Sequence, residues 1–480
     1  MNRGTSSKTI FISADHGLAL IYFLQSDVVS TLRQAGFRVV VLVADAMVDV
    51  LARENEGSGI TFEGLRLEQA ASYAIRESGE WQWWLQFLRR VGASSRINTA
   101  AVDSYIRQVA VEEPNRRRLL MPLAWLAIAM LRRSAYARGL LGSAQQRLVP
   151  SIYEDLFDRY RPALVVASTP GWRLDRFLLR EAAQRGIQTA TTIVGWDNPS
   201  SYCLPGAKVD WATCWSDIQK TELMSGSDWR EEQVHIGGIP SYDGYFQRKW
   251  VIPREEYFQL NGLDPDLKLL SYACSFITYA PNLPNVKALA NLVINGTLTV
   301  PSQLLIRLHP NHFLDVPLFA NERREIQRIA DESPNVHVVE PVPLGRDLGH
   351  YSGEDMPEKS SMMAHSDVFV TVYSTMVVET AIHGSPIVSL CLDTPGGWKT
   401  PRKYSLPLSQ IGNWPTHQRF REAGAGKVVY TREQLAQAVN TYLEDPDVDQ
   451  GHRNAFVQRE VTYTDGSAGR RTGQFLAGLM

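Results

Sequence analysis

The sequence predicts an α/β protein made of two doubly wound domains, each with its own parallel sheet. The chain has 480 residues, more than the roughly 250 to 300 at which a single core stops growing. Short strand patterns alternate with helix patterns, and this alternation begins twice, at Thr9 and at Leu269. Strands separated by helices pair in parallel through right-handed crossovers. We therefore expect a first domain over 1–240, a linker over 241–265, a second domain over 266–455 and a tail over 456–480 that packs back on the first domain.

The first domain opens with a strand, a helix and a second strand. TIFISA, Thr9–Ala14, is a short buried-strand pattern, and a helix pattern covers Leu20–Gln34. Gly36 suits the cap of that helix, and Arg38–Val43 predicts the next strand. From about 47 to 144 the sequence has long charged and aromatic helical stretches with few strand signals. This range predicts a helical insertion in the first domain.

Strand patterns return after the insertion and start again in the second domain. Those of the first domain are Ala163–Ser168, Thr189–Val194, Trp211–Trp215 and a closing segment, Val234–Pro240. Those of the second domain are Leu269–Ala273, Leu304–Leu308, Val336–Glu340, Asp367–Val372, Ile387–Leu390 and Lys427–Tyr430. In an open parallel sheet, ligands bind beyond the carboxyl ends of the strands. The turns that follow these strands are therefore the expected positions of functional side chains.

The composition argues against nucleic-acid binding and against export. With 49 basic and 51 acidic residues the formal charge is −2, which gives no whole-chain attraction to nucleic acid or to an anionic membrane. The four cysteines lie far apart without a CxxC pair, as expected for buried thiols in a reducing cytoplasm. The polar start, Met1–Lys8, lacks the apolar core of a signal peptide. We expect a cytoplasmic protein.

One apolar stretch, Leu119–Leu131, has a composition that suits a membrane surface. At ~1.5 Å per residue it covers only about 20 Å, too short to span a bilayer. Arg116–Arg118 and Arg132–Arg133 flank it, and Trp125 lies inside it. One interpretation is an interfacial element that holds the protein on anionic lipid at the inner face of the cell membrane. The other is a buried helix with arginines at its ends.

A turn in the second domain has the features of a phosphate site. In SDVFVTVYSTMVVETAIHGSPIV a hydrophobic strand leads into Tyr373, Ser374 and Thr375, and a helix follows. The first turn of a helix presents unpaired N–H groups and the positive end of its dipole, both of which favour phosphate. Glu379, one turn further on, could accept hydrogen bonds from both hydroxyls of a ribose. Alternatively, Ser374 only caps the helix and Glu379 is only a charged helix residue.

Two other strand ends in the second domain carry polar residues. LLIRLHPNH places Arg307, His309 and Asn311 after one strand, and Ser275 follows the opening strand of the domain. A His-Pro turn there could bind a diphosphate or stabilise a leaving group as charge develops on it. The alternative is a solvated loop histidine.

These motifs together resemble a known family. A His-Pro turn followed about 65 residues later by a Tyr-Ser-Thr turn and a carboxylate is similar to the nucleotide-binding half of CDP-glycerol glycerophosphotransferases and related bacterial surface-polysaccharide glycosyltransferases. GIPSYD, Gly238–Asp243, resembles their Gly-x-Pro-x-x-Asp signature, and the segment that begins GWDNPSS at Gly195 resembles their Trp-Asp-Asn segment. The match covers roughly Gly195–Ser389 and the tail motif Asp465–Arg470.

The resemblance implies a GT-B fold, with two Rossmann-like domains facing a central cleft, and a nucleotide-sugar donor. It implies that His309, Ser374, Thr375 and Glu379 bind the nucleotide and its phosphates. The glycerophosphotransferases commonly have Asp-Tyr-Ser-Ser and a later Asp, whereas here Val372 precedes the tyrosine and Glu379 takes the later position. Glutamate there favours transfer of a sugar to a glycan, lipid-linked or cell-surface acceptor. Thr371 stands where many retaining members have the first Glu of a Glu-x7-Glu pair, which favours inversion.

An inverting transferase needs a base that takes the proton of the acceptor hydroxyl. In GT-B enzymes this base usually comes from the first domain. Asp15 and His16, followed by Gly17, end the first strand, so His16 acting with Asp15, or Asp15 directly, is the first candidate. Asp197 is the second candidate. Gly17 and Trp196 are expected to contact the acceptor, and Trp196 offers a platform for a sugar ring. Either segment could instead be a structural turn.

No metal and no resident cofactor are expected. The Asp-x-Asp pairs, Asp264/Asp266, Asp445/Asp447 and Asp447/Asp449, lie in turns away from the predicted donor strand ends. No Gly-x-Gly-x-x-Gly follows the first strand, and the chain has no P-loop motif. The alternatives are a CDP-glycerol-type polyol-phosphate transferase, a nucleotide-sugar epimerase or binding protein of the same fold, and a membrane-surface scaffold.

Overall fold

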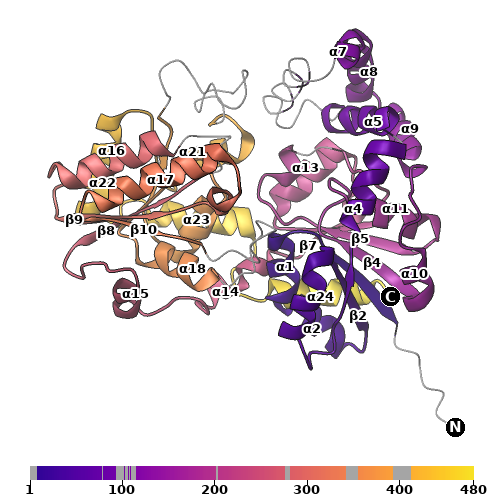
Figure 1. Ribbon diagram of the computed structural model, residues 1–480, viewed down its shortest axis with the longest axis horizontal. Helices are drawn as coiled ribbons and strands as arrows, with labels where there is room; N and C mark the ends of the chain where they lie inside the picture. Colours follow the sequence, from indigo (N-terminus) through magenta and orange to yellow (C-terminus); the bar gives the residue numbers. More distant parts are fainter. Residues whose placement is uncertain are drawn as a thin grey trace. The chain divides into compact units, whose positions relative to one another are not determined.

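The computed structural model describes residues 8–77, 79–92, 102, 106, 109, 115–201, 204–275, 282–341, 355–392 and 412–480. The chain divides into two compact units, Met1–Asp243 with Val461–Met480, and Gly244–Glu460. In each unit helices cover both faces of a parallel sheet (Figure 1). The α/β class predicted from the sequence is confirmed.

The first unit has a seven-stranded parallel sheet in the order β3-β2-β1-β4-β5-β6-β7. Its strands are β1 (Thr9–Ala14), β2 (Arg38–Val43), β3 (Thr61–Gly64), β4 (Pro162–Ala167), β5 (Gln188–Thr192), β6 (Trp211–Cys214) and β7 (Val234–Ile236). In β1, Ile10 lies beside Val39 of β2 and Leu164 of β4. All of β1 is buried, because helices cover the sheet on both sides.

The α-helices of the first unit connect and cover these strands. They are α1 (Gly17–Leu24), α2 (Asp27–Gln34), α3 (Val48–Glu54), α4 (Leu67–Ser72), α5 (Gly79–Val91), α7 (Asn115–Leu119), α8 (Met121–Arg133), α9 (Ala135–Gln146), α10 (Glu154–Tyr160), α11 (Arg176–Gln184), α12 (Asn198–Ser201), α13 (Asp217–Ser227) and α24 (Ala468–Gly478). The single helix expected over Leu20–Gln34 is interrupted, since Ser26 caps α2 by accepting from Val28 N at 3.3 Å.

The predicted start of the helical insertion, at about 47, is wrong. Strand β3 lies inside the range 47–144 and pairs with β2, Phe62 beside Val41. The sequence signal was weak because TFEG is a four-residue edge strand in which only Phe62 is buried. The helices that lead away from the sheet begin with α4.

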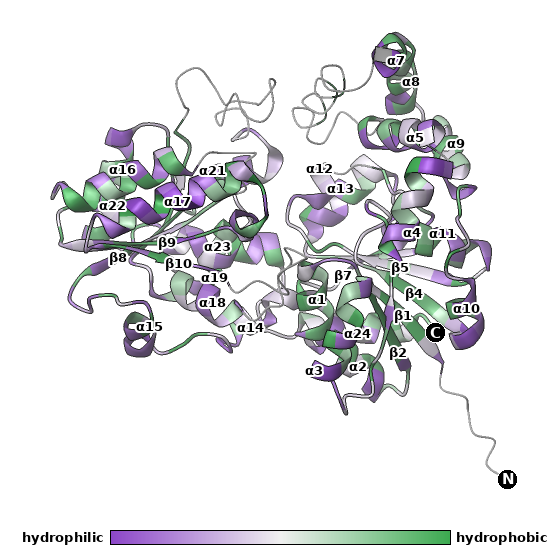
Figure 2. Cartoon of the chain, in the orientation of Figure 1, coloured by the Kyte–Doolittle hydropathy of each residue, from purple (hydrophilic) through white to green (hydrophobic). Residues whose placement is uncertain are grey.

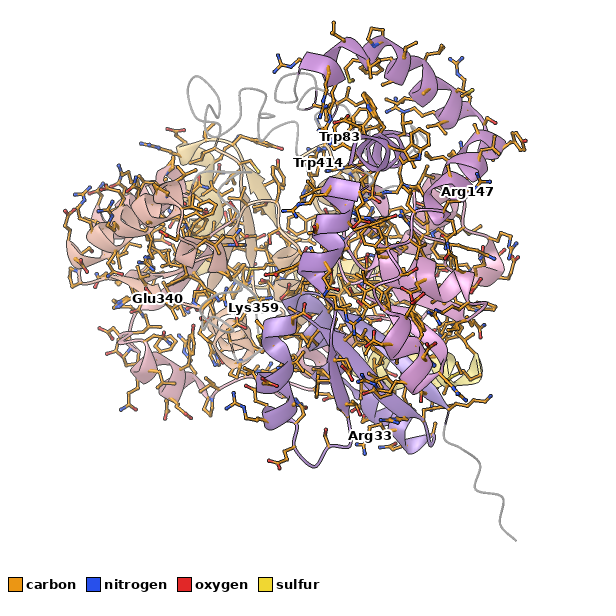
Figure 3. All side chains as sticks on the ribbon, turned by 45° about the vertical axis from the view of Figure 1, so that its right-hand side comes forward. Arg33, Trp83, Arg147, Glu340, Lys359 and Trp414 are labelled. Atoms are coloured by element: carbon orange, nitrogen blue, oxygen red, sulfur yellow. The ribbon has the colours of Figure 1, made fainter. Side chains whose placement is uncertain are left out.

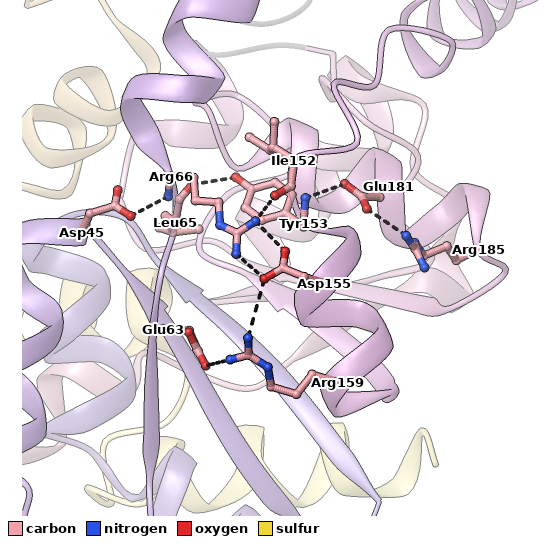
Figure 4. A network of polar contacts seen from close by, with 10 residues as sticks. All are labelled: Asp45, Glu63, Leu65, Arg66, Ile152, Tyr153, Asp155, Arg159, Glu181 and Arg185. Carbon is pink, nitrogen blue, oxygen red and sulfur yellow. Dashed lines mark hydrogen bonds and ion pairs between the residues drawn. The ribbon is translucent and has the colours of Figure 1, made fainter.

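Ion pairs tie this edge strand to α10 (Figure 4). Arg66, which follows β3, places both terminal nitrogens on the Asp155 carboxylate, at 2.6 and 2.7 Å. Its backbone N donates to Asp45 at 3.2 Å, while Arg159 of α10 pairs with Glu63 at 3.1 Å. Half-exposed pairs of this kind contribute about 0 to 1 kcal/mol each. Their main effect is to fix the position of a short edge strand.

The C-terminal helix α24 packs against α2 in the first unit. The Asp243 carboxylate accepts from the first N–H groups of α24, Ala468 N at 2.9 Å and Gly469 N at 2.7 Å. A Cβ added at Gly469 would lie 2.7 Å from Asp27 N, and one at Gly473 would lie 2.7 Å from Thr31 Cβ. The glycines of the tail therefore permit a close approach of the two helices. The aspartate of GIPSYD and the tail motif DGSAGR thus meet at one helix N-terminus.

The second unit has a six-stranded parallel sheet in the order β10-β9-β8-β11-β12-β13. Its strands are β8 (Lys268–Ala273), β9 (Ser302–Arg307), β10 (Val336–Val339), β11 (Val368–Thr371), β12 (Ile387–Leu390) and β13 (Lys427–Val429). Its helices are α15 (Arg254–Leu260), α16 (Leu283–Ile294), α17 (Pro317–Asp331), α18 (Met356–His365), α19 (Met376–His383), α21 (Pro415–Ala423) and α22 (Arg432–Glu444). Helices α14 (Asp243–Phe246) and α23 (Gln450–Val461) contain the two unit boundaries. The predicted linker, 241–265, contains α14 and α15.

Strand order reverses once in each sheet, between β1 and β4 and between β8 and β11. At such a switch point the connecting helices leave to opposite sides, and ligands bind beyond the carboxyl ends of the strands. Cys214, Cys274 and Cys391 are buried thiols, and Cys203 lies outside the described residues. In the described part of the chain no helix is long and apolar enough to cross a membrane.

Candidate functional site

The predicted phosphate turn lies at the switch point of the second unit. Tyr373 has φ of 30°, so the chain turns sharply between β11 and α19. Ser374 Oγ accepts from Met376 N at 3.2 Å and thereby caps the first turn of α19, which leaves the hydroxyl hydrogen to donate elsewhere. Thr375, the N-cap residue, makes no side-chain cap bond. The two hydroxyls therefore stand beside the helix N-terminus, where an anion is favoured.

Glu379 is a buried residue in an ion pair, contrary to its interpretation as a merely charged helix position. Its side chain is 7% exposed. Tyr245 Oη donates to Glu379 Oε2 at 2.7 Å, and Lys359 Nζ lies 2.5 Å from the same oxygen (Lys359 is labelled in Figure 3). One carboxylate oxygen is thus held in place, and Lys359 balances the charge. Neither partner was identified from the sequence, because both come from other helices.

His309 is fixed as a neutral imidazole with a defined tautomer. Its Nδ1 accepts from Asn311 N at 3.1 Å, so the proton lies on Nε2. Burial, and to a smaller extent electrostatic interactions with His312 and Arg307, lower the pKa of His309 to about 3. At neutral pH His309 is therefore an uncharged N–H donor at the carboxyl end of β9. Asn311 contributes its backbone to this turn.

A buried network connects the His309 turn to the Ser275 turn. His309 N donates to His312 Nδ1 at 3.0 Å, and His312 Nε2 lies 2.9 Å from Glu322 Oε2. Glu322 accepts from Asn282, whose Oδ1 accepts from Ser275 N at 2.7 Å. Burial alone would raise the pKa of Glu322, but bonds from His312 and Asn282 hold it below its usual value. The two histidines of HPNH were the available sequence signal for this network.

Arg307, which was also predicted to bind the donor, is held in two ion pairs within the second unit. Its side chain is 6% exposed and pairs with Asp355 at 2.6 Å and Glu358 at 2.7 Å. Arg307 is the last residue of β9, whose six residues are all buried. Asp355, the N-cap residue of α18, and Glu358 in the first turn of α18 neutralise the guanidinium. The arginine thus links α18 to the sheet.

The remaining predicted residues of the second unit lie at one edge of its sheet. Ser275, His309 and the 373–375 turn follow β8, β9 and β11, which are three adjacent strands.

In the first unit, Asp15 and His16 form a dyad at the switch point. His16 Nδ1 lies 2.7 Å from Asp15 Oδ1, which also accepts from Ser168 Oγ at 2.8 Å. Arg173 Nε donates to Asp15 Oδ2 at 2.6 Å. Burial alone would raise the pKa of Asp15, but the contacts with His16, Arg173 and Ser168 hold it well below its usual value. Since the ionised Asp15 carboxylate can only accept, His16 Nδ1 donates to it, and Nε2 is the ring nitrogen that can take a proton.

A second buried carboxylate lies beside this dyad. Asp175 is 1% exposed and accepts from Thr169 Oγ1 at 2.6 Å and from Thr169 N at 3.1 Å. Burial and the negative charge of Asp15 raise the pKa of Asp175 to about 7. Ser168, Arg173 and Asp175 were not predicted from the sequence. Their only signal was their position directly after β4, the neighbour of β1 in the sheet.

In the Trp-Asp-Asn segment, Trp196, which was expected to offer a platform for a sugar ring, is buried, and Asp197 and Asn198 are hydrogen-bonded within the first unit. Trp196 is 1% exposed, so its ring offers no open face for stacking. Asp197 Oδ2 accepts from Ser201 Oγ at 3.2 Å and its backbone O accepts from Ser201 N, which closes the short helix α12. Asn198 Oδ1 accepts from Gly195 N. Gly17, the other residue expected to contact an acceptor, is the buried first residue of α1.

A cavity of about 370 Å³ in the first unit is lined by α9, the 204–208 loop and the end of α13, and no predicted site residue lines it. Among the described residues, no group of three or more His, Cys, Asp or Glu side chains could hold a metal ion.

Comparisons with known proteins identify the fold. No family model and no curated protein sequence match the chain. Solved structures match over nearly the full length. A glycosyltransferase from Rickettsia africae is 11% identical, with 99% of this chain and 98% of that chain covered and a TM-score of 0.53. A UDP-GlcNAc 2-epimerase from Neisseria meningitidis, bound to UDP-GlcNAc, is 12% identical, with 98% and 99% covered and a TM-score of 0.51.

A UDP-GlcNAc 2-epimerase from Methanocaldococcus jannaschii is 11% identical, with 98% of this chain and 99% of that chain covered and a TM-score of 0.52. Together with the two parallel sheets, these likenesses confirm the GT-B fold. At this level of identity they are informative about the fold alone. The relationship to CDP-glycerol glycerophosphotransferases stays a prediction from the motifs.

Proposed function

We propose that the chain is an inverting, metal-independent glycosyltransferase that moves a sugar from a nucleotide donor to a glycan, lipid-linked or cell-surface acceptor. The observation that carries this proposal is the Asp15–His16 dyad at the end of β1, with Nδ1 of His16 held at 2.7 Å from the carboxylate. A base oriented in this way suits removal of a proton from a hydroxyl nucleophile. The turn at Ser374 and Thr375 lies at the N-terminus of α19 and suits phosphate binding, which supports a nucleotide as part of the donor.

In the proposed reaction His16 Nε2 takes the proton of the acceptor hydroxyl while the acceptor oxygen forms a bond to the anomeric carbon. The bond from that carbon to the donor phosphate oxygen breaks, and the nucleoside diphosphate leaves. His309 Nε2–H and the N–H groups at the start of α19 would stabilise the charge that develops on the diphosphate. Asp15 orients His16, and its three hydrogen-bond partners make it unsuited to act as the base directly.

The second candidate function is epimerisation of a nucleotide sugar, because two of the solved structures reported above are UDP-GlcNAc 2-epimerases of the same fold. The two functions differ in whether an acceptor is needed. A polyol-phosphate transferase is separated from both by its CDP-polyol donor.

The test is an activity assay with nucleotide sugars and CDP-glycerol as donors and a panel of sugars, oligosaccharides and lipid-linked sugars as acceptors. We expect free nucleotide to be released from a nucleotide sugar only when an acceptor is present, and His16→Ala to abolish this release. Isomerised donor without acceptor would replace the proposal with epimerisation. Transfer from CDP-glycerol, with no transfer from any nucleotide sugar, would replace the proposed glycosyltransferase with a polyol-phosphate transferase.

A further inference from the structure

Helices α7, α8 and α9 present a concentrated set of exposed apolar side chains. We call this set the α8 surface: Leu119, Leu120, Leu123, Trp125, Leu126, Met130, Tyr136 and Leu140. These are eight of the eighteen large apolar side chains that are exposed in the described part of the chain, and they lie within 22 residues. Figure 2 shows α8 largely in the hydrophobic colour, on helices that project from the rest of the first unit. Exposed apolar groups in such a cluster indicate an interaction surface.

In the described part of the first unit, only one face of α8 packs against other helices. One face of the helix, with Met121, Ala124 and Ile128, packs in a core cluster with Phe87 of α5. Trp83 of α5, labelled in Figure 3, packs against the same cluster. The other face carries Leu123 at 66%, Leu126 at 71% and Met130 at 58% exposure. A surface helix normally has a polar face toward water, whereas α8 is apolar on both faces.

The charged side chains of the α8 surface region are basic. Residues 115–147 contain seven arginines and no acidic residue, in a chain whose formal charge is −2. The Arg116 side chain is 70% exposed, and Arg133 and Arg147 are exposed at the ends of α8 and α9 (Arg147 is labelled in Figure 3). Two acids from other elements, Glu80 and Asp228, pair with part of this set. Against these two acids, the seven arginines of residues 115–147 keep a net positive charge.

We propose that the α8 surface docks the protein onto an anionic lipid bilayer, with α8 lying in the interface. Its thirteen residues measure about 20 Å, too short to span the hydrocarbon core but suited to lie at the boundary of headgroups and acyl chains. The exposed leucines and Trp125 enter this boundary, and the arginines contact lipid phosphates.

A second copy of the chain fits this surface less well. In a two-fold symmetric dimer the same patch faces itself, so the arginines of the two copies would be brought together. Like charges at an interface are unfavourable. An anionic bilayer complements both the apolar and the basic part of the surface. The proposal is independent of the proposed function, since it rests on this surface alone.

The test is co-sedimentation of the full chain with vesicles of phosphatidylcholine alone and of phosphatidylcholine mixed with phosphatidylglycerol. We expect binding to the mixed vesicles, reduced by high salt, and little binding to phosphatidylcholine. Leu123→Asp combined with Leu126→Asp should weaken binding by about tenfold or more, because both side chains would then carry charge into the apolar layer. Arg118→Gln combined with Arg133→Gln should weaken binding at low salt and reduce its salt dependence.

The matched control is Leu260→Asp with Ile294→Asp, two exposed apolar residues of the second unit at 67% and 54% exposure, which should bind like the wild type. Thermal unfolding checks that every variant is folded. Absence of vesicle binding, equal binding to both vesicles, or unchanged binding by the Leu123/Leu126 variant would each overturn the proposal. Self-association that this variant abolishes, without vesicle binding, would assign the surface to a second copy.

Discussion

At the residue scale, His309 combines burial with a fixed proton position. Its pKa is lowered to about 3 mainly by burial, so it is neutral over the whole physiological range. Because Nδ1 accepts from Asn311 N, the proton of the neutral ring lies on Nε2. The residue therefore suits hydrogen bonding to a phosphate oxygen and does not act as a cation.

This assignment predicts how nucleotide binding depends on His309 and on pH. His309→Ala should weaken binding of a nucleoside diphosphate about tenfold or more, the usual effect of losing a hydrogen bond to a charged group. Binding by the wild type should show no His309 titration between about pH 5 and pH 8, because the depressed pKa lies below that window. Isothermal titration calorimetry measures both, with the exposed His452→Ala as control. Binding that weakened as pH rose through 6 to 7 would show that a cationic histidine is needed.

The dyad in the first unit leads to a separate prediction. His16→Ala should lower transfer by about 10²- to 10⁴-fold, the range typical of a positioned general base. Donor affinity should stay within about twofold, since the base contacts the acceptor. Single-turnover assays with donor in excess separate the two effects. Retained turnover would contradict the assignment of His16 as the base.

The sequence predicts site residues well where turn-forming residue types directly follow a strand pattern. The Tyr-Ser-Thr and His-Pro turns lie where the strand pattern placed them. Their partners, such as Lys359 for Glu379 and Arg173 for Asp15, could not be predicted, because tertiary packing selects them from distant elements. The expectation that Trp196 stacks on a sugar ring has the same difficulty. A tryptophan beside an aspartate suggests such a platform, but tertiary packing decides whether its ring is buried.

At the element scale, the contact of α24 with α2 depends on glycine. A methyl group at Gly473 would lie 2.7 Å from Thr31 Cβ and 3.0 Å from Val28 O, so one helix must shift. Gly478, on the same helix, has open space at its Cβ position. The two positions form a matched pair.

We expect Gly473→Ala to destabilise the first unit by about 1 to 3 kcal/mol through overpacking. Gly478→Ala should be neutral or stabilise by up to about 1 kcal/mol, because alanine favours helix more than glycine. Chemical denaturation measures the free energy of unfolding for each variant. Equal effects at the two positions would contradict the close packing of α24 on α2.

Element boundaries show what sequence patterns detect well. β1 was predicted at its observed bounds because four of the six residues of TIFISA are apolar, as is typical of a strand that helices cover on both sides. β3 was missed because an edge strand with one buried residue gives almost no apolar signal. The doubly wound order of the strands follows from crossover rules, whereas a four-residue edge strand is decided by pairing with β2.

At the scale of the whole molecule, the second unit contains three histidines that must stay neutral when folded. Burial is the largest cause in each case and lowers the pKa of His309 to about 3, of His383 to about 4 and of His417 to about 3. In the unfolded chain each would titrate near about 6.5. Between about pH 4 and pH 6.5 the unfolded state therefore binds more protons than the folded state.

The second unit should consequently lose stability as pH falls through this window. Each such histidine contributes a slope approaching about 1.4 kcal/mol per pH unit in the free energy of unfolding, with stability highest above pH 6.5. His383→Asn should reduce the slope, measured by denaturation at several pH values. A slope that the substitution leaves unchanged would show that carboxylates dominate the acid sensitivity.

The proposed function requires that the second unit binds the nucleotide of a sugar donor at the start of α19. The most direct measurement is thermal unfolding of the full chain with a panel of nucleoside diphosphates and nucleotide sugars, for the wild type, Glu379→Ala and His16→Ala. We predict that at least one nucleotide raises the Tm of the wild type and of His16→Ala, and that Glu379→Ala loses most of this shift while remaining folded without ligand. If no nucleotide stabilises the wild type, or if Glu379→Ala is stabilised equally well, the claim is contradicted.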